Sequence, residues 1–239
     1  MSYNVHRCIG ADRAAWPGRI AAVISHYAPD VVALQELDVG HARSGHADQP
    51  DLLAEALGMH YCFHPAMEAA NERYGDAIMS RLPLELVKAA VLPTLPHRPL
   101  LERRGALWVT VTVGGRRVQL LNTHLGLVRR ERLAQVESLI GDAWLGDPRC
   151  TSPRIVCGDF NTWPGTLAYR HLRSVLRDAQ EGIPFKRRRG TYPSRFPMLS
   201  IDHIFHSPDV RVTAVRVPRT RLTRWASDHL PVIADVLLP

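Results

Sequence analysis

Cysteine is scarce in this sequence, and long apolar runs are absent from it. The four cysteines (Cys8, Cys62, Cys150 and Cys157) are scattered and form no Cys-x-x-Cys pair, which excludes a zinc ribbon and a redox motif of that type. No window approaches the roughly 18 uninterrupted apolar residues of a membrane-spanning helix. The first residues lack the apolar segment of a signal peptide. We therefore expect a soluble, reduced protein of the cytoplasm with no transmembrane segment.

Low-complexity segments, internal repeats and Ser/Gly-rich linkers are also absent. The 239 residues are 46% hydrophobic and 22% charged, a composition that excludes a disordered or collagen-like chain. We expect a single domain over residues 1–239. Lysine and arginine total 30 against 23 for aspartate and glutamate, a net charge of +7. This balance favours a polyanionic partner, but it is equally compatible with a mildly basic soluble enzyme.

Short apolar, β-branched runs bounded by turn residues recur along the chain and predict strands. They cover Val31–Leu34, Tyr74–Met79, Leu84–Leu92, Leu107–Val113, Val118–Asn122, Arg154–Cys157, Leu199–Phe205, Val210–Val217 and Leu230–Leu237. Gly114-Gly115, between two of these runs, predicts a hairpin and therefore antiparallel pairing. Helical periodicity is clear over Trp16–Tyr27, Asp51–Leu57 and Arg129–Leu145. Few helices and many hairpin-connected strands favour an α+β fold in which helices cover sheets.

Polar side chains interrupt or end the predicted strands at six places. Singly, each is typical of a turn, a cap or a solvated strand end. Together they need another explanation, because a buried carboxylate is costly unless it is paired or bound to a metal. Such a set could hold a divalent cation and bind a phosphate. Its members are Asn4, Glu36, Asn122 to His124, Asp159 with Asn161, Asp202, and Asp228 with His229.

The donor types in this set indicate which metal it would hold. Carboxylate and amide oxygens dominate, and hard oxygen ligands suit Mg²⁺ or Mn²⁺, whereas zinc would need more histidine or cysteine. The sequence has 12 histidines, but the His-x-x-x-His pair of His60 and His64 has no glutamate beside its first histidine. Its aromatic spacing is typical of a strand. We therefore predict Mg²⁺ or Mn²⁺ as the cofactor.

Seven motifs, in order from residue 3 to residue 231, resemble those of the endonuclease/exonuclease/phosphatase superfamily, whose members include DNase I and neutral sphingomyelinases. The two specific ones are Gly158-Asp-Phe-Asn161 and Ser227-Asp-His-Leu-Pro231. The others are Tyr3-Asn-Val-His6, Leu34-Gln-Glu36, Tyr74-Gly-Asp-Ala-Ile-Met-Ser-Arg81, Asn122-Thr-His-Leu125 and Ile201-Asp-His203. The resemblance implies a four-layered α/β/β/α sandwich of two packed, mainly antiparallel sheets, with the active site at one edge.

The resemblance also implies a metal-dependent hydrolase of phosphoric ester bonds. Glu36 would be the principal metal ligand, with Asn4 beside it and Asp228 near the same cation. Two features depart from the superfamily pattern. Asp76 stands where relatives more often carry asparagine or another small residue. Only three residues precede Asn4, so the first strand is expected to be short.

Five further residues would act on the substrate, again by resemblance. Asp159 would orient or deprotonate the attacking water, and Asn161 would hold the phosphate. His229 would hydrogen-bond a phosphate oxygen while Asp202 sets its tautomer, and His124 would contact the phosphate from the other side. Phosphodiester hydrolysis needs such an in-line water and donors around the phosphoryl oxygens.

The substrate has competing interpretations. The basic run Lys186, Arg187, Arg188 and Arg189, near Tyr192 and Phe196, suits a nucleic-acid backbone and would make the protein a nuclease. The compact chain and Thr191-Tyr-Pro-Ser194 instead look like small bacterial members, and favour a phospholipid head group or a small phosphate ester. A non-catalytic binding module is a remote third alternative, because every metal and catalytic position is retained. No protein partner is inferred.

Overall fold

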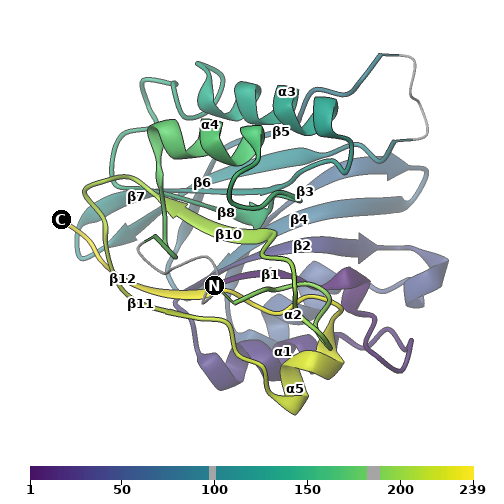
Figure 1. The fold of residues 1–239 in the computed structure, drawn as a ribbon. Coiled ribbons are helices and arrows are strands. Elements are labelled where there is room, and N and C mark those ends of the chain that lie inside the picture. The colour runs from purple at the N-terminus through teal and green to yellow at the C-terminus, as the bar shows by residue number, and fades with distance from the viewer. Residues whose placement is uncertain (97–100, 182–188) are drawn as a thin grey trace.

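The computed structural model describes residues 1–96, 101–181 and 189–239, which form four stacked layers (Figure 1). Two β-sheets lie face to face in the middle, and helices cover the outer face of each sheet. Both sheets are mainly antiparallel. The expected α+β fold and its α/β/β/α layering are therefore confirmed.

The first sheet has four strands in the order β1-β2-β4-β3. Its strands are β1 (Ser2–Asn4), β2 (Val31–Val39), β3 (His60–Ala69) and β4 (Glu72–Ser80). The short β1 pairs in parallel with β2, and the other pairs are antiparallel. Helices α1 (Pro17–Tyr27) and α2 (Gln49–Leu57) pack on its outer face. Asp48 caps the N-terminus of α2, which therefore begins two residues before the predicted start.

The second sheet has six strands in the order β5-β6-β7-β8-β10-β9. They are β5 (Leu84–Val91), β6 (Gly105–Val113), β7 (Arg116–His124), β8 (Arg154–Asp159), β9 (Arg177–Asp178) and β10 (Asp202–His206). Gly114 and Gly115, both with positive φ, make the predicted two-residue hairpin turn between β6 and β7. Strands β7 and β8 pair in parallel, and helices α3 (Arg129–Ile140) and α4 (Leu167–Val175) cover the outer face.

Alternation along the strands divides the core into three parts. In β2, Leu34 packs toward the helices while its neighbour Ala33 packs toward the other sheet. In β6, Trp108 lies under the helices while Leu107 and Val109 face the first sheet. This period of two is what a strand buried on both faces requires. Each sheet can therefore bury one face against the other sheet and one against helices.

The last strand starts beside the first one. Strands β11 (Arg211–Arg216) and β12 (Ile233–Leu237) form a two-stranded ribbon, and Val232 bridges to Ser2 of β1. The short helix α5 (Arg221–Ala226) lies between them in the sequence and packs near α1. The 3-10 helices His6–Cys8 and Ala42–Ser44 complete the described elements. Within the ranges described, no helix is long and apolar enough to cross a membrane.

Several predicted boundaries are wrong, and β2, predicted to end at Leu34, ends at Val39. The helix predicted over Arg129–Leu145 ends at Ile140, because Gly141 is extended there and a turn carries the buried Trp144 into the core. The strands predicted from Leu199 and Leu230 begin at Asp202 and Ile233. Helices α4 and α5 were not predicted, although a threonine side chain caps each of them. That cap was a readable signal.

Candidate active site

Strand register places three of the predicted residues in a row. His124 at the end of β7 lies opposite Asp159 at the end of β8. Asp202 at the start of β10 pairs with the same Asp159. Parallel β7 and β8 end at one edge of the sheet, and antiparallel β10 begins there. The three side chains therefore meet at that edge. In the sequence, Asp159 lies 35 residues after His124 and 43 residues before Asp202.

A bulge in β2 carries Glu36 to the same edge. The register between β2 and β4 shifts between Leu34 and Leu37, and Glu36 has a φ of 63°, a conformation that is uncommon outside glycine. Asn122 stabilises the bulge, because its Nδ2 donates 2.8 Å hydrogen bonds to the carbonyls of Leu34 and Ala77. Backbone strain of this kind persists where the surroundings over-determine it, often at functional sites.

Asn4 links Glu36 to the second sheet. Its Nδ2 donates to Glu36 Oε1 and to Asp159 Oδ2, both at 3.0 Å. Its Oδ1 accepts a hydrogen bond from the backbone N–H of His6. Asn4 is fully buried, so its amide holds two carboxylates from different sheets at a set spacing.

His229 and Asp202 form a buried ion pair beside Asp159. His229 Nδ1 lies 2.9 Å from Asp202 Oδ2, and its Nε2 lies 3.7 Å from Asp159 Oδ2. Burial alone would lower the pKa of His229, but the carboxylates of Asp202 and Asp159 outweigh it and raise that pKa to about 10. Burial and the neighbouring charge of Asp202 raise the pKa of Asp159 to about 7. His229 is therefore a cation at neutral pH that points at Asp159.

His124 is the opposite case, a buried neutral imidazole. Burial, helped by the charges of Arg104 and His229, lowers the pKa of His124 well below its usual range. Arg104 Nη1 lies 3.1 Å from His124 Nδ1. A guanidinium can only donate, so Nδ1 accepts and Nε2 carries the proton. Nε2 lies 3.5 Å from Asp159 Oδ2 and 3.2 Å from Asn161 Nδ2.

Asp228 and Glu36 line a polar pocket of about 290 Å³, together with the two histidines and Asp159. Ser227 Oγ donates to the carbonyl of Asn4, which ties the segment before Asp228 to β1. The side chain of Asp228 is 40% exposed and lies 3.6 Å from His6 Nδ1. The structure thus brings together all eight residues predicted as catalytic or metal-binding.

The pocket also contains residues that were not predicted as site residues: His6, Arg7, Tyr74, Glu102, Arg104 and Tyr192. His6, Tyr74 and Tyr192 lie within motifs singled out in the sequence, so a signal was present. Arg104 had none, because one arginine before a strand does not show where it points. Of the predicted substrate-binding run, Lys186, Arg187 and Arg188 lie outside the described residues, and Arg189 is exposed.

Two groups of donors could hold a cation at this edge. Asp159, Asp202 and His229 offer ligand atoms within 4.8 Å of one another, but a histidine must lose its proton before it can ligate, and these carboxylates raise the His229 pKa to about 10. Glu36 and Asp228 are partly exposed and line the pocket, so a hydrated ion can reach them. The oxygen donors of the second group fit a divalent cation better.

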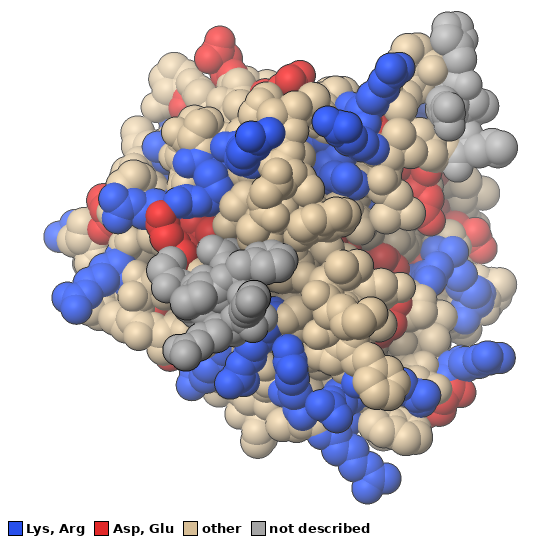
Figure 2. Space-filling model, in the orientation of Figure 1, with Lys and Arg blue, Asp and Glu red and all other residues tan. Residues whose placement is uncertain are grey.

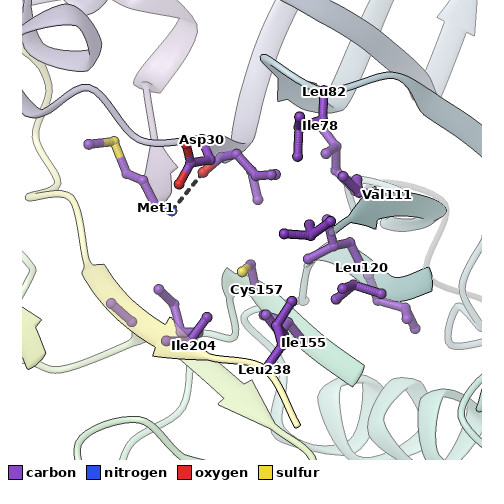
Figure 3. A pocket seen from close by; sticks show the side chains of 17 residues that line it. Met1, Asp30, Ile78, Leu82, Val111, Leu120, Ile155, Cys157, Ile204 and Leu238 are labelled. Atoms are coloured by element: carbon purple, nitrogen blue, oxygen red, sulfur yellow. Dashed lines mark hydrogen bonds between the residues drawn. The ribbon is translucent and has the colours of Figure 1, made fainter. Parts of the chain in front are cut away.

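A second cavity, of about 420 Å³, lies between the sheets at the opposite end of the strands (Figure 3). Its walls are almost entirely apolar, with Ile78, Leu120 and Ile204 among them. Asp30 is the one carboxylate among the described residues that line it. The acid–base groups needed for chemistry are therefore concentrated in the polar pocket at the other end.

Comparison with known proteins agrees with this geometry. The profile of the Endonuclease/Exonuclease/phosphatase family matches residues 1–229. The chain belongs to this family. Its members hydrolyse phosphoester bonds and typically use divalent metals.

Three proteins illustrate the family relationship. "Uncharacterized protein YbhP" of Escherichia coli K12 is 25% identical over an alignment of 254 positions, gaps included, which covers 100% of this chain and 95% of YbhP. An endonuclease/exonuclease/phosphatase from Beutenbergia cavernae is 27% identical, with a TM-score of 0.78, over 99% of this chain and 70% of that one. Mannosyl-6-phosphatase Bt3783 of Bacteroides thetaiotaomicron, at 23% identity, shares the fold with a TM-score of 0.78 over 99% and 98%.

Proposed function

We propose that this protein is a phosphodiester hydrolase that depends on Mg²⁺ or Mn²⁺. The observation that carries the proposal is the contact of Asp159 with both His229 and Asn4 beneath a carboxylate-lined pocket. A buried carboxylate near a protonated imidazole, with a polar pocket above, suits attack by water on a phosphoryl centre. Family membership supports the same reaction class.

Glu36 and Asp228 would hold the cation, and Asn4 would position Glu36. When bound, the cation would offset negative charge on the phosphoryl oxygens. Asn4 Nδ2 donates to Glu36 Oε1, so that oxygen is already oriented. Both carboxylates line the pocket with Arg104 and His6, and the positive charge of Arg104 would also attract an anionic substrate.

Asp159 would take the proton of the attacking water. Burial and the charge of Asp202 raise the pKa of Asp159 from its ordinary 3.8 to about 7. A general base works best at neutral pH when its pKa lies near this value. Asn4 Nδ2 and the backbone N–H of Asn161 each donate to one of its oxygens. These two hydrogen bonds leave the carboxylate a single orientation in the pocket.

His229, His124 and Asn161 would hold the phosphoryl oxygens. His229 is protonated and offers Nε2–H, which supports charge stabilisation of the transition state. Neutral His124 offers Nε2–H from the other side, in the tautomer that Arg104 imposes. Asn161 adds a neutral donor without bringing another negative charge to the phosphate. Asp202 would act through His229 as a positioning residue.

The experiment is a turnover assay with bis(p-nitrophenyl) phosphate and with p-nitrophenyl phosphate, a monoester. We expect diester hydrolysis that requires Mg²⁺ or Mn²⁺, is abolished by EDTA and is lost in Asp159→Asn. A preference for the monoester would favour the small phosphate-ester alternative, and phospholipid cleavage would favour the head-group alternative. No turnover of any phosphoester, with metal binding retained, would indicate a non-catalytic module and refute the proposal.

A further inference from the structure

A side groove of about 310 Å³ lies next to the active-site pocket. His6 and Asp228 line both the groove and the pocket, so the two are neighbours. Ile9 lies along the groove, and Arg195, Phe196 and Arg224 also line it. Whatever occupies the groove can therefore be part of the molecule whose phosphate lies in the active site.

The groove is held in place by the same segment that carries Asp228. The backbone N–H of Ser194 donates to the carbonyl of Asp228 at 2.6 Å, and its Oγ donates to the carbonyl of Arg224 at 3.3 Å. The N–H of Phe196 closes a turn onto the carbonyl of Pro193. These hydrogen bonds hold Arg195 and Phe196 at a fixed distance from Asp228, the proposed metal ligand. This preorganisation lowers the entropy cost of binding a ligand in the groove.

Positive charge surrounds the groove. Among the described residues no ion pair engages Arg195 or Arg224, and both are exposed. Partial burial lowers the pKa of Arg219, and the positive charges of Arg189 and Arg224 lower it further, so this side of the molecule carries positive charge beyond the groove itself. Figure 2 shows lysine and arginine side chains gathered on the lower part of this face, where Figure 1 places α5. The surface is complementary to an anion with more than one phosphate.

Phe196 adds a flat aromatic ring to this positively charged groove. This residue is 76% exposed, so its ring contributes little to the stability of the fold. Arginines beside an exposed aromatic ring are the combination that binds single-stranded nucleic acid, with phosphates on the cations and an unpaired base on the ring. A flat membrane surface fits a concave groove less well than an extended chain does.

We propose that the side groove binds the nucleotide next to the scissile phosphate of a single-stranded nucleic acid. Arg195 and Arg224 contact its backbone phosphate, and Phe196 stacks on its base. The inference rests on the proposed function and extends it, because it names the substrate class of the same site.

The test is binding of a short fluorescent single-stranded oligonucleotide, measured by anisotropy in EDTA so that the strand stays intact. Phe196→Leu keeps an apolar side chain but removes the ring, and should weaken binding about tenfold; Phe196→Trp should retain it. Arg195→Ala with Arg224→Ala should lower the log–log salt slope by about 0.7, the value for one lost phosphate contact on a single strand.

Two control variants are matched to these changes. Met198→Ala removes an apolar side chain that is 80% exposed in the same loop, and should leave binding unchanged. Arg116→Ala removes an exposed positive charge at the start of β7, the strand whose other end carries His124. It should therefore leave the salt slope unchanged.

Each outcome decides for or against the proposal. Equal affinity of Phe196→Leu and the wild type, or a slope that the double arginine variant leaves unchanged, would overturn it. Binding to phosphatidylglycerol vesicles that needs both Phe196 and Met198, without oligonucleotide binding, would replace it by a lipid surface. If bis(p-nitrophenyl) phosphate is hydrolysed but these effects are absent, only this inference fails. If no phosphoester is hydrolysed, the proposed function itself fails.

Discussion

Replacing Asp202 by asparagine isolates the charge of the Asp202–His229 pair. The side chain is fully buried, and asparagine has the same shape and still offers an oxygen to His229 Nδ1, which lies 2.9 Å away. Only the negative charge is lost. A charge of opposite sign at this distance shifts a pKa by about 1–3 units. The His229 pKa should therefore fall from about 10 by that amount, which corresponds to about 1.4–4 kcal/mol.

The assay is an NMR titration of the histidine rings in metal-free protein. The sign of the change is set by the wild-type pKa, which lies above the unfolded value of 6.5. The ion pair thus contributes stability below pH 6.5, and that contribution is lost as pH rises toward 10. In Asp202→Asn the loss should come at lower pH. As a control, Asp178→Asn should lower the pKa of His203, which Asp178 raises against the effect of burial, and leave His229 unchanged.

The same pair gives a kinetic prediction. Asp202→Asn and His229→Ala should each reduce turnover about 10²–10⁴-fold, the usual contribution of a positioned acid or base. The double variant should lose little more than either single one, because residues that act as a unit are not additive. An unchanged His229 pKa in Asp202→Asn, or losses that multiply in the double variant, would refute the proposed coupling.

Three further predictions test the metal, the buried charges and the packing. Glu36→Gln should weaken Mn²⁺ binding in calorimetry and raise the Mg²⁺ concentration needed for half-maximal turnover; wild-type metal affinity would contradict its role as a ligand. Burial raises the Asp76 pKa from 3.8 to about 7, so ionisation destabilises the fold as pH rises through this range. Asp76→Asn should therefore increase the free energy of unfolding in urea by about 4 kcal/mol at pH 8 and by little at pH 4; equal gains at both pH values would be contrary evidence. Gly75→Ala would place a Cβ 1.9 Å from the carbonyl oxygen of His64 and should cost on the order of 3 kcal/mol. Gly45→Ala meets no atom within 4 Å but has a left-handed φ of 69°, so it should cost only about 1–2 kcal/mol in the same unfolding experiment.

The secondary structure was predictable where local chemistry decides it. Gly114-Gly115 predicted the hairpin because two adjacent glycines adopt the positive φ values that a tight turn needs. The end of α3 was missed because the apolar pattern continues past Gly141 into a turn that is equally buried. Periodicity reports burial, and a buried turn satisfies it as well as a helix does. The interpretation of residues 1–239 as one domain stays a prediction.

The candidate site was predictable as a set of residues but not as an arrangement. Glu36, Asp159 and His229 stand out because charged side chains at the ends of apolar strands need a reason to be there. By resemblance, Asn4 was expected beside Glu36 at the metal; in the structure its amide also joins Glu36 to Asp159 across two sheets. The hydrogen bond from Asn4 to Asp159 joins residues 155 positions apart, and no local sequence pattern predicts such a contact.

By itself, the sequence determined the fold class, the family and the donor types of the site, because strand periodicity, turn residues and short motifs are local properties of the chain. Only the tertiary structure decided the protonation states. Asp202 and Asp159 raise the pKa of His229, while burial and the charges of Arg104 and His229 lower that of His124. Two histidines of ordinary sequence context thus differ in charge, one protonated and one neutral. The reason is that a pKa depends on burial and on the charges within a few ångströms, and both are set when distant strands pack together.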